Sequence, residues 1–350
     1  MGRRDPGGGG LAPPDAAAPW PTAVVGLGLI GGSILRGLGA AAVPATGWDA
    51  DPGVRSAGAD AGLSVTDSLE QALAGARLVV VAVPPVAVAT VAADVLGRAP
   101  EASVCDVCSV KGPVVVGVAA AAGAAAERFV GGHPLAGSEQ GGFAASREGL
   151  FVGASWALCP DGAGLAAMLA AAGLVETLGA EAVILSARSH DEAVARSSHL
   201  AHVLGGLAAR SAAAEPAATL SGGALRDASR VAGSDPVLWT EILLANAAAL
   251  LPVLSTAGEA LLGVQAALAA RDGAALRQAL ESGAASRAAI LRARRAPGAW
   301  TGRDIELDGW RETLTGLGEH GRRVRGLRVE GDRLRFETTA SSIDDRVGSG

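Results

Sequence analysis

The sequence has few cysteines, no long unbroken apolar run and no excess of positive charge, and each shortage excludes a class of protein. Three cysteines in 350 residues cannot form the disulfide framework of a small secreted protein. No apolar run reaches the ~18 residues typical of a membrane-spanning helix. The formal net charge of −6 argues against a nucleic-acid partner. We therefore expect neither a membrane nor a nucleic acid as a partner.

The three cysteines are Cys105, Cys108 and Cys159, and the first two form a CxxC motif. Such a motif can be a redox pair or half of a zinc site, but only one further cysteine is available to complete a ligand set. The surrounding sequence SVCDVCSV instead predicts thiols in or beside a buried strand, and we expect no metal. No apolar segment follows Arg3-Arg4 to make a secretion signal, and with reduced thiols this indicates a cytoplasmic protein.

The composition divides the chain into four segments. Residues 1–20 contain mostly glycine, alanine and proline, which predicts a disordered leader. Residues 21–188 hold short apolar segments that alternate with helical patterns, which indicates a parallel sheet with helices on both faces. Residues 189–295 are almost entirely helix-forming. Residues 296–350 contain LRVEGDRLRFET, which predicts a hairpin around Gly331 before a disordered tail.

The helical segment is apolar on too many sides for helices that face water. Runs of alanine and leucine such as LANAAALLPVLSTAGEALLGVQAALAA leave few polar positions on any face. Helices of this kind are buried in a bundle or in a contact between subunits. We therefore expect the helical domain to form a homodimer.

A glycine-rich turn follows the first apolar segment. Gly26, Gly28 and Gly31 form a GxGxxG pattern in TAVVGLGLIGGSILRGLGA, after a predicted strand and at the start of a predicted helix. These glycines would allow a tight turn, the close approach of a pyrophosphate and close packing of the helix on the strand. Asp49, in GWDAD, lies about 20 residues further on, where a carboxylate holds the ribose hydroxyl groups and repels a 2′-phosphate.

This arrangement predicts an NAD site rather than an NADP site, the alternative being a glycine turn in an ordinary α/β domain. The expected fold class is an α/β Rossmann-like dinucleotide-binding domain followed by an all-α helical domain. The residues expected to bind NAD are Gly26, Gly28, Leu29, Ile30, Gly31, Asp49 and Pro84.

Two polar residues follow consecutive predicted strands. His133 lies in GGHPLAGSEQGG, directly after a strand, and Ser109 follows the preceding strand in CSVKG. The carboxyl ends of the strands are the usual ligand site of such a sheet. Oxidation of an alcohol needs a base at the hydroxyl group while a hydride leaves to the nicotinamide. We predict that His133 is this base and that Ser109 orients it.

Five motifs occur in the order found in prephenate dehydrogenases. They are GLGLIGGS, DVCSVK at Asp106–Lys111, GGHPLAGSE, SHLAH and RDASRVAGSDPVLW. The sequence resembles that family over about residues 22–295, and HPLAGSE and SRVAGSDPVLW are its most specific elements. The resemblance implies oxidation and decarboxylation of prephenate to 4-hydroxyphenylpyruvate, with reduction of NAD, in tyrosine biosynthesis.

The resemblance also implies roles for individual residues. His133 is similar to the catalytic histidine that takes the proton of the 4-hydroxyl group, and Ser109 to its hydrogen-bonding partner. Arg230 is similar to the residue that binds the ring carboxylate, and a guanidinium suits that group because it can bind it through two hydrogen bonds. The residues expected to line the substrate pocket are Ser198, His202, Glu139 and Trp239.

Purely structural explanations remain open for several of these residues. Arg230 could form an ion pair with Asp227, three positions earlier on the same helix. Ser198 and His202 are four positions apart and share a helix face, so they could form a hydrogen bond between helices. Trp239 could pack in the core.

Three other functions remain open. Within the family, one or two side-chain contacts decide whether the substrate is prephenate, arogenate or 4-amino-4-deoxyprephenate. A β-hydroxyacid or imine reductase shares the glycine pattern but typically uses a lysine in its helical domain, and this sequence has no lysine after Lys111. The alternative without catalysis is an NAD-binding regulatory protein on the same fold.

Overall fold

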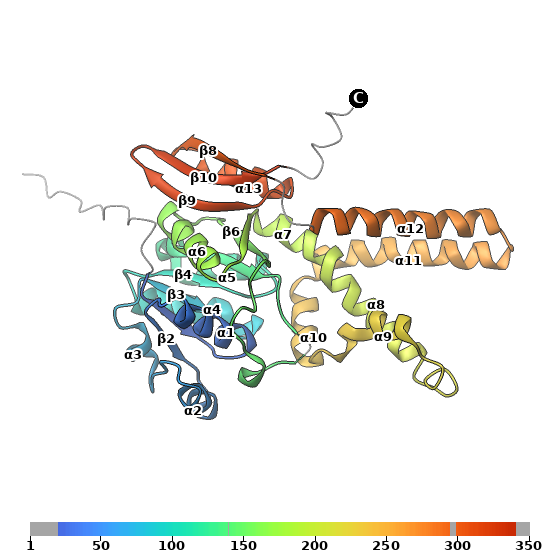
Figure 1. Cartoon of the computed structure of the whole chain (residues 1–350), viewed down its shortest axis with the longest axis horizontal. Coiled ribbons are helices and arrows are strands. Elements are labelled where there is room, and N and C mark those ends of the chain that lie inside the picture. The colour runs from blue at the N-terminus through green and yellow to red at the C-terminus, as the bar shows by residue number, and fades with distance from the viewer. Residues whose placement is uncertain (1–19, 139, 295–298, 341–350) are drawn as a thin grey trace, which may run out of the picture.

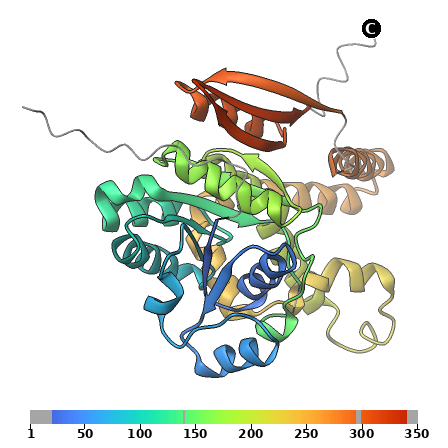
Figure 2. The ribbon, with the colours of Figure 1, turned by 60° about the vertical axis from the view of Figure 1, so that its left-hand side comes forward.

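The computed structural model of the chain describes residues 20–138, 140–294 and 299–340 (Figure 1). The expected leader, apart from Trp20, and the expected tail after Ala340 lie outside these residues. In the described part, ten strands form one sheet in the order β2-β1-β3-β4-β5-β6-β7-β9-β10-β8. Helices pack on both faces of its first half (Figure 2).

The first five strands are parallel, as the alternation of strands and helices predicted. They are β1 (Thr22–Val25), β2 (Ala45–Trp48), β3 (Leu78–Val81), β4 (Ser103–Asp106) and β5 (Phe129–Pro134). β1 and β3 are rich in valine and are buried at every position, because helices cover both faces of the sheet. Since all five strands run in one direction, their carboxyl ends lie at the same edge.

The prediction of a parallel sheet is wrong for the next strand. β6 (Ser155–Cys159) runs antiparallel to β5, and β7 (Glu181–Ile184) runs parallel to β6. The described part of the connection from β5 to β6 holds a short 3₁₀ turn, η2 (Phe143–Ala145), and no α-helix. A parallel partner needs a crossover, usually a helix, whereas an antiparallel partner does not.

Helices on the two faces of the sheet enclose two apolar cores. One core contains residues of α1 and α6, and the other contains residues of α4 and α5. The helices of this domain are α1 (Leu29–Ala40), α2 (Pro52–Asp60), α3 (Leu69–Leu73), α4 (Pro85–Arg98), α5 (Gly112–Ala122) and α6 (Leu165–Thr177), and a 3₁₀ turn, η1 (Gly123–Arg128), follows α5. Side chains of Asp51 and Ser68 cap the N-termini of α2 and α3.

From Ala187 onward, the described chain is helical as far as Arg294 apart from short loops. The elements are α7 (Ala187–Val194), a π-helical turn η3 (Ala195–His199), α8 (Leu200–Ser211), α9 (Gly223–Ser229), a 3₁₀ turn η4 (Arg230–Gly233), α10 (Pro236–Ala245), α11 (Ala247–Ala269) and α12 (Gly273–Arg294). α11 and α12 lie side by side and extend away from the sheet (Figure 1). By length and composition alone, α11 could cross a membrane, although its sequence contains no unbroken apolar run of the length expected of a membrane span.

The C-terminal segment extends the sheet. Its elements are β8 (Trp300–Glu306), α13 (Trp310–Glu319), β9 (Val324–Glu330) and β10 (Arg333–Thr339). β9 and β10 form an antiparallel hairpin around Gly331, which has a positive φ of 63°. β8 pairs with the other side of β10, and β9 pairs with β7 of the nucleotide-binding domain. β8 and α13 were not predicted from the sequence.

Candidate active site

The glycine-rich turn lies between β1 and α1, and each of its three glycines is required for a different physical reason. Gly26 has a φ of +93°, and a Cβ there would lie 2.4 Å from the carbonyl oxygen of Ala82. A Cβ at Gly31 would lie 1.9 Å from the carbonyl oxygen of Gly26. Gly28 instead faces open space, and no side chain caps the first turn of α1. The helix N-terminus therefore offers unblocked N–H groups that fit a pyrophosphate.

Asp49 follows β2 and is fixed against this turn. One oxygen of its carboxylate accepts a hydrogen bond from the backbone N of Leu27 at 2.7 Å, and the other accepts from the backbone N of Asp51 at 2.9 Å. Each carboxylate oxygen has a further lone pair, so the group can also accept from ribose hydroxyl groups. These residues fit a dinucleotide. The other residues predicted for this site begin α1 or precede α4: Leu29, Ile30 and Pro84.

His133 lies near the carboxyl end of β5 and is part of a chain of three buried polar residues. Its Nδ1 lies 2.9 Å from Nε2 of His190, and Nδ1 of His190 lies 2.8 Å from Oδ1 of Asp191. His190 and Asp191 belong to α7, the first helix of the helical domain. The contacts therefore join the two domains at the edge of the sheet where ligands bind.

Ser109 and His133 are both among the described residues, and they do not form the expected hydrogen bond. Ser109 lies half-buried in the loop after β4, while Nδ1 of His133 contacts His190. A ring nitrogen has one site for a hydrogen bond in the ring plane, so His190 excludes Ser109 from Nδ1. The structure thus places His190, and not Ser109, at Nδ1 of His133, while a catalytic role for Ser109 stays a prediction. Glu139, also predicted for the pocket, lies outside the described residues.

Asp191 is held by the backbone at the start of α5. Its Oδ1 accepts a hydrogen bond from the N of Lys111 and its Oδ2 accepts from the N of Gly112, both at 2.8 Å. Burial alone would raise the pKa of Asp191, but the hydrogen bonds from His190 and these two N–H groups lower that pKa below its ordinary value. Asp191 is therefore an ionised carboxylate at neutral pH, and it caps a helix that has no capping side chain of its own.

A buried ion pair between Lys111 and Asp106 contacts the backbone of Gly132, the residue before His133. Oδ1 of Asp106 accepts from the N of Gly132 at 2.9 Å, and Nζ of Lys111 donates to the O of Gly132 at 2.7 Å. Burial alone would lower the pKa of Lys111, but the Asp106 carboxylate raises that pKa above its ordinary value of 10.5. Lys111 thus stays charged, and together with Asp106 it fixes the backbone N–H and C=O groups of Gly132, the residue that precedes His133.

Burial also determines the charge of His133. It lowers the pKa of His133 well below 6.5, and the neighbouring His190, Lys111 and His199 act in the same direction when they carry positive charge. The imidazole is therefore neutral at pH 7. A neutral histidine whose second ring nitrogen is available can accept a proton from a substrate.

A second group of rings lies beside Asp191. Nδ2 of Asn246 donates to the backbone O of Asp191 at 2.9 Å and lies 3.0 Å from Nδ1 of His199. Trp239 stacks on His202, with ring centroids 3.2 Å apart and an angle of 19° between the planes, and it meets His199 edge to face. Trp239 also packs against the core beside α4 and α5. It thus both packs in the core and contacts a residue predicted for the pocket.

The remaining predicted substrate residues lie around His202. The backbone O of Ser198 accepts a hydrogen bond from Nδ1 of His202 at 3.0 Å, so the expected link between helices is instead a link within one helical segment. Arg230 lies in η4, which packs against α8. Burial lowers the pKa of His202, the hydrogen bond to Ser198 acts to raise it, and the positive charge of Arg230 acts to lower it, with a net decrease. Asp227 forms an exposed ion pair with Arg226, at 3.7 Å.

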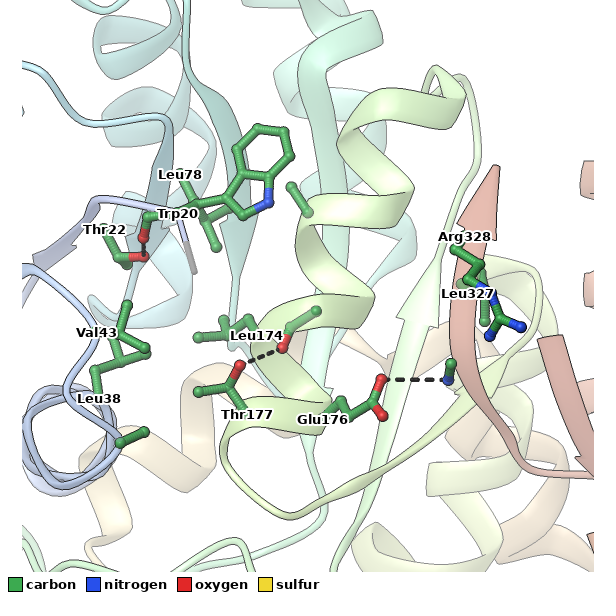
Figure 3. Close-up of a pocket in the computed structure, with 14 residues that line it drawn as sticks. Trp20, Thr22, Leu38, Val43, Leu78, Leu174, Glu176, Thr177, Leu327 and Arg328 are labelled. Carbon is green, nitrogen blue, oxygen red and sulfur yellow. Dashed lines mark hydrogen bonds between the residues drawn. The ribbon is translucent and has the colours of Figure 1, made fainter. Parts of the chain in front are cut away.

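A cavity of about 440 Å³ lies elsewhere (Figure 3). It is bounded by Thr22 and Leu78, at the amino ends of β1 and β3, and by residues of α6 and β9. Glu176 of α6 accepts a hydrogen bond from the N of Gly326 in β9 at 3.2 Å. No residue predicted for the site lines this cavity, and dinucleotides bind at the carboxyl ends of the strands. The cavity is therefore distinct from the candidate active site.

The three cysteines lie outside the site chemistry. All are buried free thiols, and burial raises the pKa of Cys108 to about 11. A thiol with so high a pKa stays protonated at neutral pH and is a poor metal ligand. Within the described residues, no group of three potential ligands could hold a metal ion.

Two family models match consecutive parts of the chain. The nucleotide-binding domain of prephenate dehydrogenase matches residues 34–184, and the dimerization domain of prephenate dehydrogenase matches residues 186–282. A cyclohexadienyl dehydrogenase of Zymomonas mobilis is 35% identical over 263 residues, which are 72% of this chain and 89% of that protein. The chain belongs to the prephenate dehydrogenase family.

Solved structures of this family share the fold. A putative prephenate dehydrogenase of Corynebacterium glutamicum has a TM-score of 0.78 and 31% identity, and the match covers 87% of this chain and 98% of that one. An arogenate dehydrogenase of Synechocystis has a TM-score of 0.66 and 26% identity, with coverage of 77% and 99%. These matches confirm the α/β Rossmann-like domain and the helical domain that follows it. As predicted, the protein is an NAD-dependent oxidoreductase.

Proposed function

We propose that this member of the family oxidises and decarboxylates prephenate to 4-hydroxyphenylpyruvate in tyrosine biosynthesis. The observation that carries the proposal is the state of His133. It is neutral at pH 7, it lies at the ligand-binding edge of the sheet, and His190 occupies its Nδ1. Its Nε2, for which the described residues provide no hydrogen-bond partner, is therefore available as a base for an alcohol.

Different residues of the chain bind the cofactor, accept the proton and bind the substrate. The glycine turn and Asp49 would hold NAD, which when bound supplies the hydride acceptor. Nε2 of His133 accepts the proton of the 4-hydroxyl group as that carbon is oxidised. We keep Ser109, in the loop after β4, as a second catalytic residue of the proposal. The new carbonyl group is conjugated with the carbon that bears the ring carboxylate, so loss of CO₂ makes the ring aromatic. Arg230 binds that carboxylate before it leaves.

The pocket residues hold the rest of the substrate. A guanidinium can hold the ring carboxylate through two hydrogen bonds without giving it a proton, which keeps the carboxylate ready to leave as CO₂. The remaining residues that we propose for the pocket are Ser198, His202, Glu139 and Trp239. We also propose that two copies of the chain associate through the helical domain and that the enzyme acts in the cytoplasm, where buried thiols remain reduced.

The test is a spectrophotometric assay of the full chain at 340 nm. Prephenate, arogenate and 4-amino-4-deoxyprephenate are each supplied with NAD and with NADP. We expect the highest kcat/KM with prephenate and NAD, and a large loss in His133→Asn. A higher kcat/KM with arogenate would favour the second candidate, an arogenate dehydrogenase, which the similarity to the Synechocystis enzyme supports. No reduced nucleotide with any of the three substrates would overturn the proposal.

A further inference from the structure

We propose that His190 and Asp191 are positioning residues that keep the neutral His133 ring protonated on Nδ1 and unprotonated on Nε2. The chain runs from Asp191 Oδ1 to His190 Nδ1, and from His190 Nε2 to His133 Nδ1, with distances of 2.8 and 2.9 Å. The catalytic consequence rests on the proposed function, because only a base needs this tautomer. The tautomer itself is a property of the folded chain and can be measured without a substrate.

The positions of the hydrogens follow from Asp191. An ionised carboxylate only accepts hydrogen bonds, and this one accepts from the backbone N–H groups of Lys111 and Gly112 as well as from His190. Nδ1 of His190 must therefore carry a hydrogen. Neutral His190 then has its lone pair on Nε2, so His133 must donate from Nδ1. The lone pair of neutral His133 is left on Nε2, where a substrate hydroxyl group can reach it.

The surroundings allow few alternatives to this order. The three residues are at most 9% exposed, so water does not readily replace His190 as the hydrogen-bond partner of Nδ1 of His133. The two imidazole rings meet edge to face, with centroids 5.1 Å apart and planes at 72°. Gly112 also contributes, because a Cβ there would lie 2.9 Å from Oδ2 of Asp191 and would displace the carboxylate.

The charge of His190 decides which tautomer His133 adopts. Burial lowers the pKa of His190, Asp191 and Asp106 act to raise it, and Lys111 acts to lower it, with a net decrease below 6.5. His190 is therefore neutral at pH 7. A second proton on His190 would place a hydrogen on its Nε2, facing Nδ1 of His133. His133 would then carry its own hydrogen on Nε2 and could not act as a base.

The same chain stabilises His133 after it accepts a proton. The ring then carries hydrogens on both nitrogens, and Nδ1–H still donates to His190, which still donates to Asp191. No proton needs to move along the chain. The negative charge of Asp191, held by two backbone N–H groups, acts on the imidazolium through one neutral ring. This arrangement favours the charged state that forms during alcohol oxidation over the state before it.

The first test measures the tautomer by ¹⁵N NMR of the imidazole nitrogens at pH 7 and above, with no ligand added. The chain has five histidines, so comparison with His133→Asn assigns the signals of residue 133. We expect the Nδ1–H tautomer in the wild type and a population of the Nε2–H tautomer in His190→Phe. A wild-type His133 in the Nε2–H form, or a ring unchanged by His190→Phe, would overturn the proposal.

The second test measures catalysis. We expect His190→Phe to lower kcat by about 10²-fold or more, the usual range for disabled acid–base chemistry, while KM for both substrates changes less than threefold. His190→Gln, whose side-chain oxygen can still accept from Nδ1 of His133, should recover part of this loss. The control is Ser189→Ala. Ser189 lies on α7 beside His190, and this change removes its hydrogen bond to Glu319 and should leave kcat unchanged. Equal losses in the Phe and Gln variants would contradict a positioning role through Nδ1.

The two tests separate this proposal from the proposed function. If no cyclohexadienol is oxidised but the Nδ1–H tautomer is present and depends on His190, the positioning of His133 stands and the substrate class is wrong. If prephenate is oxidised but the tautomer is Nε2–H, the function stands and the roles of His190 and Asp191 are wrong.

Discussion

The ion pair between Lys111 and Asp106 makes the stability of the nucleotide-binding domain depend on a single lysine, the only one in the sequence. Lys111→Met keeps most of the volume of the side chain but removes the ammonium group. The carboxylate of Asp106 would then keep only its bonds from the backbone N–H groups of Gly132 and Cys108, and the O of Gly132 would lose its donor. Removal of one partner from a buried ion pair costs about 3–5 kcal/mol.

This free energy predicts a large change in thermal stability. For a domain of 150–250 residues, 3–5 kcal/mol corresponds to a decrease in Tm of roughly 6–20 °C. Adding Asp106→Asn to Lys111→Met removes the unpaired charge, so the double variant should melt at a higher temperature than Lys111→Met alone. Arg188→Met, which breaks the exposed pair with Glu192, is the control and should change Tm little.

The measurement is thermal unfolding by circular dichroism on the full chain, at several pH values. The pKa of Lys111 is raised in the folded state, so the pair contributes fully below the unfolded pKa of about 10.4, and this stabilisation is lost as the pH rises through the folded pKa. The difference in Tm between the wild type and Lys111→Met should therefore stay constant from pH 7 to 9. A difference under about 3 °C at pH 7 would refute the reasoning, because a buried pair cannot lose one partner so cheaply.

Three further predictions concern the site. Asp49→Ser should raise KM for NAD by about 10- to 100-fold, the value of a lost charged hydrogen bond, and relax discrimination against NADP; unchanged kinetics with both nucleotides would exclude the assignment. His133→Asn should lower kcat by about 10²–10⁴-fold, and a loss under threefold would exclude His133 as the base. In the wild type, kcat should rise with pH at values below 6.5, because burial lowers the pKa of His133, and this rise should flatten in the variant. Arg230→Ala should raise KM for prephenate by at least about 30-fold with little change in KM for NAD, and lysine should restore it in part; a normal KM would leave only a structural role.

Features that depend on neighbouring residues could be predicted from the sequence. The turn at Gly26–Gly31 follows from local backbone requirements, and the structure shows a positive φ at Gly26 and no room for a Cβ at Gly31. The strands β1 and β3 were recognisable because valine runs between helical patterns indicate strands covered on both faces. Asp49 was recognisable because it lies about 20 residues beyond the turn, at the end of the second predicted strand.

Features that depend on distant residues could not be predicted in the same way. Nδ1 of His133 meets a residue 57 positions away, on a helix of the other domain, so local context suggested Ser109 instead. One signal was available in α7. Ala187, His190, Asp191 and Val194 have the i, i+3, i+4, i+7 spacing of one helix face, and all four are buried. Two polar residues between apolar ones on a buried face need partners, which indicates a site.

The antiparallel direction of β6 also could not be predicted from the local sequence. An apolar segment gives no sign of the direction in which its strand runs, and the expectation of a parallel strand relied on the helical patterns that lie between most of the strands. The connection after His133 carries the GSEQGG sequence and a short 3₁₀ turn, which are compatible with a reversal of the chain. The strand that carries the proposed base is thus where the parallel order of the sheet ends.

The exposed leucines of α11 and α12 require an explanation that the single chain does not provide. Leu261 and Leu262 are 69% and 64% exposed, and four more leucines of these two helices are exposed in the same way: Leu251, Leu268, Leu280 and Leu291. The family model that matches residues 186–282, which include α11 and the first part of α12, is named as a dimerization domain, and a second copy would cover these side chains. Burial of one leucine contributes about 1.5–3 kcal/mol, so a dimer that buries several of them is stable at micromolar concentration.

Replacement of Leu261 and Leu262 by arginine should therefore weaken the dimer. Each substitution occurs in both chains, so four leucines are removed from the dimer. The loss of at least about 6 kcal/mol raises its Kd by roughly 10⁴-fold or more, which light scattering over a series of concentrations detects as a change from twice the chain mass toward the chain mass. Val116→Arg, at a 70% exposed position on α5 of the nucleotide-binding domain, is the matched control and should leave the mass unchanged. A wild-type monomer at micromolar concentration would refute the homodimer. A double variant that stays dimeric would place the subunit contact on a different surface from the α11–α12 hairpin.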